Sequence, residues 1–130
     1  MDRAYLTYEE YVQMGGELSE NDFILAEFRA RKYIDYLTDS RVADMAEIPQ
    51  AVKLCIMTCI KVEAKFGADA QSDTPLLASY NTDGYSESYG SAADRASAAY
   101  RSLGRSIRSM LWGEEDDYGV PLLYRGVNGY

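Results

Sequence analysis

The segment between Pro49 and Gly67 constrains the fold more than any other part of the chain. Apolar residues recur along it at helical spacing, and further apolar residues fill most of the remaining circumference. The main stripe consists of Val52, Cys55, Ile56, Cys59, Val62 and Phe66, with Leu54, Met57 and Ile60 beside it. A helix that is apolar nearly all round is central and buried. Pro49 suits its start, where a missing N–H costs nothing, and Gly67 suits its end.

A second long helix is predicted from Ser19 to about Leu37. Ser19 is a favourable N-cap residue, and Asp22 places a negative charge in the first turn. One apolar stripe has the spacing of a buried face and consists of Phe23, Ala26, Ala30, Tyr33, Ile34 and Leu37. A second apolar group lies on another side and consists of Leu25, Phe28 and Tyr36. Either the helix is sandwiched within its own fold, or this second stripe faces a neighbouring subunit.

A third long helix is predicted to begin at Ser91, with Asp94 in the capping-box position. Its buried stripe consists of Ala96, Tyr100, Leu103, Ile107 and Met110. Gly104 lowers helix propensity by about 1 kcal/mol relative to alanine, so we expect it to serve close packing. On the opposite side lies a line of three basic residues, Arg101, Arg105 and Arg108. This line is either a solvated basic face or a surface that meets acidic residues of a neighbour.

A short helix is also expected near the N-terminus. Thr7 and Glu10 form a capping-box pattern, and the pair Gly15-Gly16 ends the segment. The chain of 130 residues suits one domain. The predicted fold is therefore mainly α: a small bundle of three long helices plus a short N-terminal helix.

Residues 79–90 match neither neighbouring helix. Asp83-Gly84 is a turn dipeptide, and Tyr80, Tyr85 and Tyr89 supply aromatic side chains that suit a pleated surface. We therefore predict a short β-hairpin between the last two long helices. An isolated two-stranded hairpin is marginal in water, so we expect this one to pack against its own helices or another subunit.

The composition changes after Trp112. Residues 114–117 are all acidic, and residues 118–130 are apolar and aromatic but contain three glycines and a proline. We expect residues 1–112 to form the helical domain and residues 113–130 to form an extended C-terminal arm that docks elsewhere, by strand addition over Val120–Val127. The expected apolar contacts of the arm are Val120, Leu122, Leu123 and Tyr124.

The residue types present argue against catalysis. The chain has no histidine, the commonest general base and zinc ligand, and it has no glycine-rich phosphate loop. Cys55 and Cys59 are one helical turn apart, which is typical of buried core thiols; a metal or redox role is the alternative. A calcium-loop register over residues 79–90 fails at both anchoring positions. We expect no enzyme activity, no cofactor and no metal.

Charge and hydropathy restrict the partners. The net charge is −8, with 21 acidic and 13 basic residues, which opposes tight binding to a phosphate backbone but allows a wall past which DNA slides. No apolar run approaches the roughly 18 residues that a membrane span requires, and no apolar signal-peptide core follows Met1. We expect synthesis in the cytosol and no membrane partner.

The order of these features resembles a known family. Tyr33-Ile-Asp-Tyr-Leu-Thr38 on the second helix is followed by the apolar helix, the segment Asp83-Gly-Tyr-Ser86, a final helix around Leu103 and a glycine-rich tail. This order and spacing, over about residues 5 to 125, is similar to that of the head-tail connector (adaptor) proteins of tailed bacteriophages and prophages.

The resemblance implies a structural virion protein made in the host bacterium. Such proteins form a ring, here expected to be dodecameric, that docks beneath the portal after DNA packaging. The ring extends the DNA channel and receives the stopper or tail-completion proteins. The hairpin and the tail would contact other subunits and the portal. The alternative is a small helical binding or regulatory module that captures a protein partner through its tyrosines.

Overall fold

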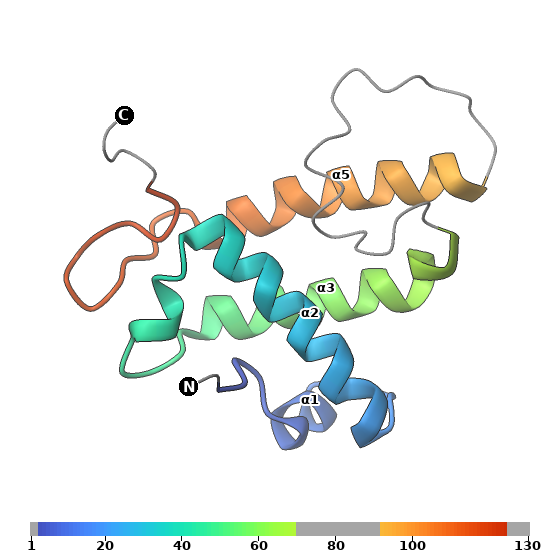
Figure 1. Cartoon of the computed structure of the whole chain (residues 1–130), viewed down its shortest axis with the longest axis horizontal. Helices are drawn as coiled ribbons and strands as arrows, with labels where there is room; N and C mark the ends of the chain where they lie inside the picture. The colour runs from blue at the N-terminus through green and yellow to red at the C-terminus, as the bar shows by residue number, and fades with distance from the viewer. Residues whose placement is uncertain (1–2, 70–91, 125–130) are drawn as a thin grey trace.

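Figure 1 shows the computed structural model, which describes residues 3–69 and 92–124. Most of these residues are helical, so the prediction of a mainly α fold is confirmed. The helices are α1 (Tyr8–Gln13), α2 (Glu20–Thr38), α3 (Gln50–Phe66) and α5 (Ala92–Leu111). Two short 3₁₀ turns follow α2 and α3, namely η1 (Val42–Asp44) and η2 (Gly67–Asp69). The predicted hairpin at residues 79–90 lies outside the described residues.

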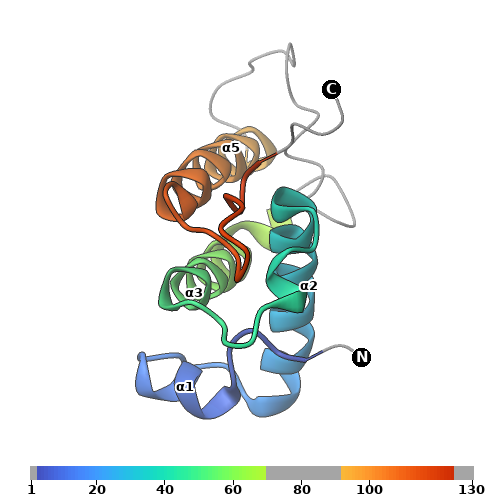
Figure 2. The same cartoon turned by 90° about the vertical axis from the view of Figure 1, so that its left-hand side faces the viewer.

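Helix α3 lies at the centre of the arrangement. It packs against α2 and against α5, and α1 packs against α2. Figures 1 and 2 show α5 antiparallel to α3 on one side, α1 on the other, and α2 crossing the stack. Four residues of the α3 stripe that was predicted to be buried have no exposed surface: Val52, Cys55, Ile56 and Cys59. Val62 and Phe66, nearer the end of the helix, are only partly buried. Leu54 differs, since it is exposed and gives α3 one solvent-facing edge.

The Tyr33 side chain of α2 reaches α5 at Gly104. A Cβ atom at this position would lie 3.1 Å from the hydroxyl oxygen of Tyr33, which is itself buried. A distance of 3.1 Å is tighter than ordinary van der Waals contact, so Gly104 does serve close packing. The contact joins the two helices that also cover α3.

A buried carboxylate holds the N-terminal segment against α2. The side chain of Glu27 accepts hydrogen bonds from the backbone N–H of Tyr5 at 2.7 Å and from the guanidinium of Arg31 at 3.1 and 3.2 Å. The hydroxyl of Tyr5 also donates to Asp35 at 2.6 Å. Because Glu27 is almost fully buried, these partners are needed to offset the loss of its hydration.

The predicted capping box at the start of α1 is present and extends to α3. Thr7 and Glu10 bond reciprocally through side chain and backbone. Glu10 also accepts a hydrogen bond from Lys53 at 2.5 Å, and this bond is the main reason that the pKa of its carboxyl is lowered. Helix α1 is therefore tied to the central helix as well as to α2.

The expectation of an extended C-terminal arm is wrong for residues 113–124. This segment turns back on itself, with an isolated antiparallel bridge between Glu115 and Pro121. The N–H of Leu122 donates to the carbonyl of Glu114 at 2.8 Å, and the Leu122 side chain is fully buried in the core of its own chain. Arg41 donates to the Leu122 carbonyl at 3.1 Å. Leu122 therefore cannot be the partner contact that the sequence suggested.

We predict energetic coupling between Gly104 and Tyr33. Gly104→Ala should destabilise the protein, because the added methyl group meets the Tyr33 hydroxyl and this outweighs a helix-propensity gain of about 1 kcal/mol. In a Tyr33→Phe background the methyl group gains room, so urea unfolding should give a coupling of at least about 0.5 kcal/mol. Ser106→Ala, on the exposed side of α5, is the control. Equal effects of Gly104→Ala in both backgrounds would contradict the contact.

We also predict that the C-terminal turn contributes to folding. Leu122→Ala should lower the free energy of unfolding by about 2–5 kcal/mol, because it removes a fully buried leucine side chain. The matched control Leu25→Ala truncates an exposed leucine side chain and should change the free energy of unfolding by no more than about 0.5 kcal/mol. Two equally small changes would show that residues 113–124 do not pack on the core.

Candidate interaction surfaces

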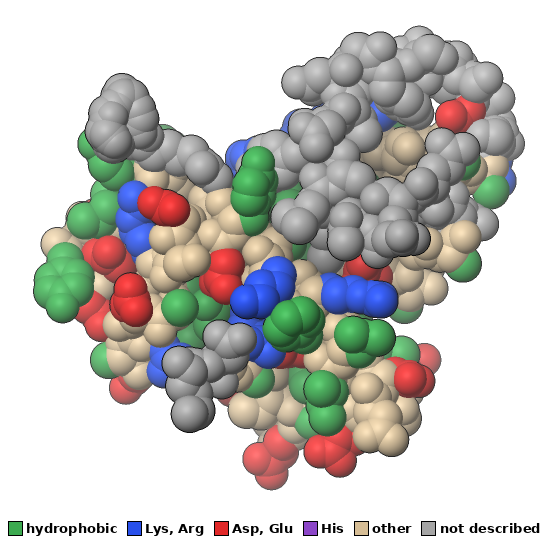
Figure 3. Space-filling model, viewed as in Figure 1, with side chains coloured by type: hydrophobic (Ala, Val, Ile, Leu, Met, Phe, Trp, Pro, Cys, Tyr) green, Lys and Arg blue, Asp and Glu red, His purple; other side chains and the backbone are tan. Residues whose placement is uncertain are grey.

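The first surface is the outer face of α2, which we call the α2 stripe: Ile24, Leu25, Phe28 and Tyr36. The sequence predicted three of these residues as a second apolar stripe, and all four are exposed. Leu25 is 52% exposed and Phe28 is 41% exposed. On the face shown in Figure 3, apolar and basic side chains lie next to each other. The stripe therefore lies at the surface and is not sandwiched within the described part of the fold.

Basic side chains flank the aromatic ring of Phe28. The guanidinium carbon of Arg31 and the ammonium nitrogen of Lys32 each lie 5.3 Å from the ring centroid. This is within the range of cation–π attraction, which is worth about 0.5–1 kcal/mol at exposed sites. The contacts orient the ring at the surface. The α2 stripe consequently offers apolar area together with positive charge.

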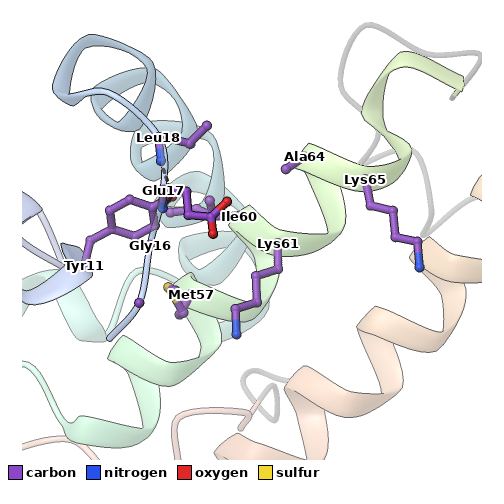
Figure 4. A pocket seen from close by; sticks show the side chains of 10 residues that line it. Tyr11, Gly16, Glu17, Leu18, Met57, Ile60, Lys61, Ala64 and Lys65 are labelled. Atoms are coloured by element: carbon purple, nitrogen blue, oxygen red, sulfur yellow. Dashed lines mark hydrogen bonds between the residues drawn. The ribbon is translucent and has the colours of Figure 1, made fainter. Parts of the chain in front are cut away.

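The second surface is a groove between the α1–α2 connection and the second half of α3. Its apolar lining includes Tyr11, Leu18, Met57 and Ile60, and it encloses about 550 Å³ (Figure 4). Glu17, Lys61 and Lys65 also line it. The groove has more positive than negative charge, in a chain whose overall charge is strongly negative.

Local packing at Tyr11 builds one wall of this groove. A Cβ atom at Gly16 would overlap the Tyr11 ring, so the glycine allows the chain to lie directly against the ring. The Tyr11 hydroxyl accepts hydrogen bonds from the backbone N–H of Glu17 at 3.1 Å and of Leu18 at 3.0 Å. These contacts fix the connection between α1 and α2 beside α3.

The third surface is the C-terminal turn, residues 112–124, which Figure 1 shows in red tones beyond α5. Two aromatic side chains are almost fully exposed here, Trp112 at 83% and Tyr118 at 89%. The Asp116 carboxylate accepts hydrogen bonds from the N–H groups of Tyr118 and Val120, at 2.8 and 2.9 Å, and thereby fixes the turn. A smaller hollow of about 380 Å³ is lined in part by Trp112, Glu115, Pro121, Leu123 and Tyr124.

The remaining predicted contact residues occupy different environments. Arg105 and Arg108 are exposed on α5, and Arg101 is half-buried. In the C-terminal turn, Val120 and Leu123 are half-buried, whereas Tyr124 is exposed with Arg41 5.6 Å from its ring centroid. Tyr80, Tyr85 and Tyr89 lie outside the described residues.

Sequence reasoning missed the groove and the two exposed aromatic residues. The groove depends on contact between segments distant in sequence, and helical periodicity does not report such contacts. The sequence offered one indication that Trp112 is exposed: it comes directly before Gly113, a residue that suits the end of a helix. In the structure Gly113 has a φ of 86°, and α5 ends at Leu111. A large aromatic residue at such a helix end has little of its own chain to pack against.

Within residues 3–69 and 92–124, no group of three or more potential metal-ligating side chains occurs. In that same part of the chain, no helix is both long enough and apolar enough to cross a membrane. Cys55 and Cys59 are free and buried, as predicted.

The environment of both thiols suppresses their ionisation. Burial, together with the negative charge of Glu114, raises the pKa of Cys55 to about 12. Burial is also the main cause that raises the pKa of Cys59 well above its ordinary value. Burial likewise raises the pKa of the Glu63 carboxyl, against the opposing effect of Arg29. These shifts are desolvation effects of a packed core.

Comparison with known proteins identifies no relative: no protein-family model, no curated protein sequence and no solved structure matches this chain. The functional interpretation therefore depends on the three surfaces and on the order of sequence features.

We predict that both thiols are unreactive in the folded protein. A disulfide reagent at pH 8 should modify Cys55 and Cys59 at least about 100-fold more slowly in the native state than in urea, because thiolate is the reactive form. A Ser102→Cys variant, with a new thiol on the exposed side of α5, should react at that position as fast as an unfolded chain. Fast, stoichiometric reaction of the native wild-type protein would contradict the buried placement.

Proposed function

We propose that this protein is a non-catalytic structural subunit of a ring that connects the portal of a tailed phage or prophage to its tail. In this proposal the ring, expected to be dodecameric, docks beneath the portal, extends the DNA channel and receives the stopper or tail-completion protein. The proposal rests on the resemblance described above. The exposed α2 stripe is the structural observation that supports it.

The α2 stripe supports assembly because it leaves large apolar side chains in water on a rigid helix. Ile24, Leu25 and Phe28 are each more than 40% exposed. Burial of apolar surface contributes about 25 cal/mol per Å², so a partner that covers the stripe gains free energy from it. Clustered apolar residues on a surface mark contact sites more often than isolated ones do.

Two other features fit the same role. A net charge of −8 suits a protein that lines or surrounds a DNA channel without retaining DNA. Residues 79–90, proposed to form a tyrosine-rich hairpin between α3 and α5, would add contacts to a neighbouring subunit or to the portal. Partners of this ring would be further copies of the chain, the portal and the stopper, with a location in the virion at the head-tail interface.

A binding or regulatory module is the second candidate function. The exposed Trp112 and Tyr118 favour it, because aromatic residues with a polar tip are enriched in protein interfaces. Such a module would bind a cellular protein without forming a ring and without any portal. Pull-down from induced cells separates the two candidates: portal and tail proteins support the connector, and host proteins support the module.

We predict that a charge in the α2 stripe impairs assembly without unfolding the chain. The measurement is native mass spectrometry of the chain, alone and with the portal protein encoded in the same genome. Phe28→Glu should lower the yield of the assembly at least about tenfold, because it places a carboxylate in an apolar contact. Its thermal melting should stay close to that of the wild type, since Phe28 is exposed.

The matched control is Leu54→Glu, which places the same charge at an exposed apolar position of α3. This variant should assemble as the wild type does. A wild-type chain that stays monomeric both alone and with the portal would contradict the proposed function. If Phe28→Glu assembles as the wild type does, the α2 stripe is not part of the subunit contact.

A further inference from the structure

We propose that neighbouring copies of this chain meet head to tail, with the C-terminal turn of one copy seated in the groove of the next. The inserted part is the segment 112–118, which carries Trp112, Glu115 and Tyr118. The receiving part is the groove lined by Tyr11, Met57, Lys61 and Lys65. The inference rests on the proposed function and specifies its subunit contact.

The groove has the properties that such an insert requires. Its volume of about 550 Å³ lies within the range of about 300–1,000 Å³ that is typical of binding pockets. Tyr11, Met57 and Ile60 are buried and provide an apolar floor. Lys61 and Lys65 are exposed on α3, and Glu17 is the single carboxylate of the groove lining. Figure 4 shows the Lys65 side chain extending away from Glu17, and its ammonium lies 5.4 Å from the centroid of the Phe66 ring. The groove therefore suits a ligand that is aromatic and acidic at once.

The C-terminal turn has the complementary composition. Trp112 and Tyr118 are the two most exposed large apolar side chains among the described residues. Four consecutive acidic residues, 114–117, lie between them. Asp116 and Asp117 are used within the chain, since they accept backbone hydrogen bonds, but the Glu115 side chain is exposed. In the proposed contact the rings of Trp112 and Tyr118 cover the apolar floor of the groove, and the Glu115 carboxylate lies near its lysines.

These two surfaces cannot meet within one molecule. Asp117 accepts a hydrogen bond from the N–H of Ala46 at 2.8 Å, and Ala46 precedes the start of α3. Arg41, which also precedes α3, donates to the carbonyl of the buried Leu122 and so holds the turn at that same end of the bundle. The groove, by contrast, begins at Met57 and extends to Lys65. Lys61 is 11 residues beyond Gln50, or about 16 Å along the helix at 1.5 Å per residue. In the proposed contact the turn therefore comes from a second copy.

A contact between two different surfaces of identical chains is heterologous. A pair joined in this way retains one unused groove and one unused turn, so further copies add until the series closes into a ring or continues as a filament. Closure into a ring is what a connector requires. Because lysines and carboxylates face each other near the surface, the contact should weaken as salt increases.

A mixing experiment tests the contact. One variant disables the groove, Lys61→Glu with Lys65→Glu, and another disables the turn, Trp112→Ala with Tyr118→Ala. All four side chains are exposed, so both variants should keep the wild-type melting temperature. Oligomers are measured by native mass spectrometry for the chain alone and on the portal. Each variant alone should associate at least about tenfold more weakly than the wild type.

The mixture gives the decisive result. Each variant keeps one intact surface, so an equimolar mixture should form 1:1 complexes that grow no further. A third variant, Ser106→Glu, places a carboxylate at an exposed position of α5 that belongs to no predicted contact, and it should assemble normally.

If the wild type forms rings and either double variant does so equally well, the inference is overturned and the proposed function stands. An equal loss with Ser106→Glu, or a mixture without the 1:1 complex, also overturns the inference. If the wild type forms no oligomer, alone or on the portal, the proposed function fails and the inference fails with it.

Discussion

Every other part of the fold depends on the burial of α3. Four of its residues have no exposed surface, and its apolar side chains occupy most of the circumference, so it needs cover from several directions. Helices α2 and α5 provide that cover, and they also meet each other where Tyr33 lies against Gly104. The C-terminal turn adds Leu122 to the same core. Because α2, α5 and the C-terminal turn all pack into the core around α3, the stability of each depends on the others.

The same packing determines what stays at the surface. Since α2 directs one stripe at α3, its second stripe with Leu25 and Phe28 remains in water. The α1–α2 connection, held by the hydrogen bonds to Tyr11, forms a groove beside the second half of α3, whereas the acidic aromatic turn lies beyond the other end. The groove and the turn therefore lie at different ends of the chain, as the proposed serial assembly requires.

Periodicity in the sequence was sufficient to predict the helices, the Thr7 and Ser19 caps and the second apolar stripe of α2, because each depends on residues within a few turns. Whether that stripe is exposed could not be predicted in this way, because it depends on what packs against α2. Periodicity failed at Leu122. The turn before that residue uses positive φ angles at Gly113 and Gly119 and the carboxylate of Asp116, and these signals resemble those of a loose, glycine-rich arm. The groove was missed because Gly16 and Tyr11 shape it only after α1 and α2 pack beside α3. Contacts between distant segments have no local pattern.

We propose that this chain assembles as one subunit of a connector ring. A cryo-electron microscopy reconstruction of the purified chain mixed with its portal protein would test this assembly. We expect a closed ring of identical subunits on one end of the portal, with the C-terminal turn of each copy beside α3 of the next. A portal without such a ring, or single copies bound at scattered positions, would contradict this proposal.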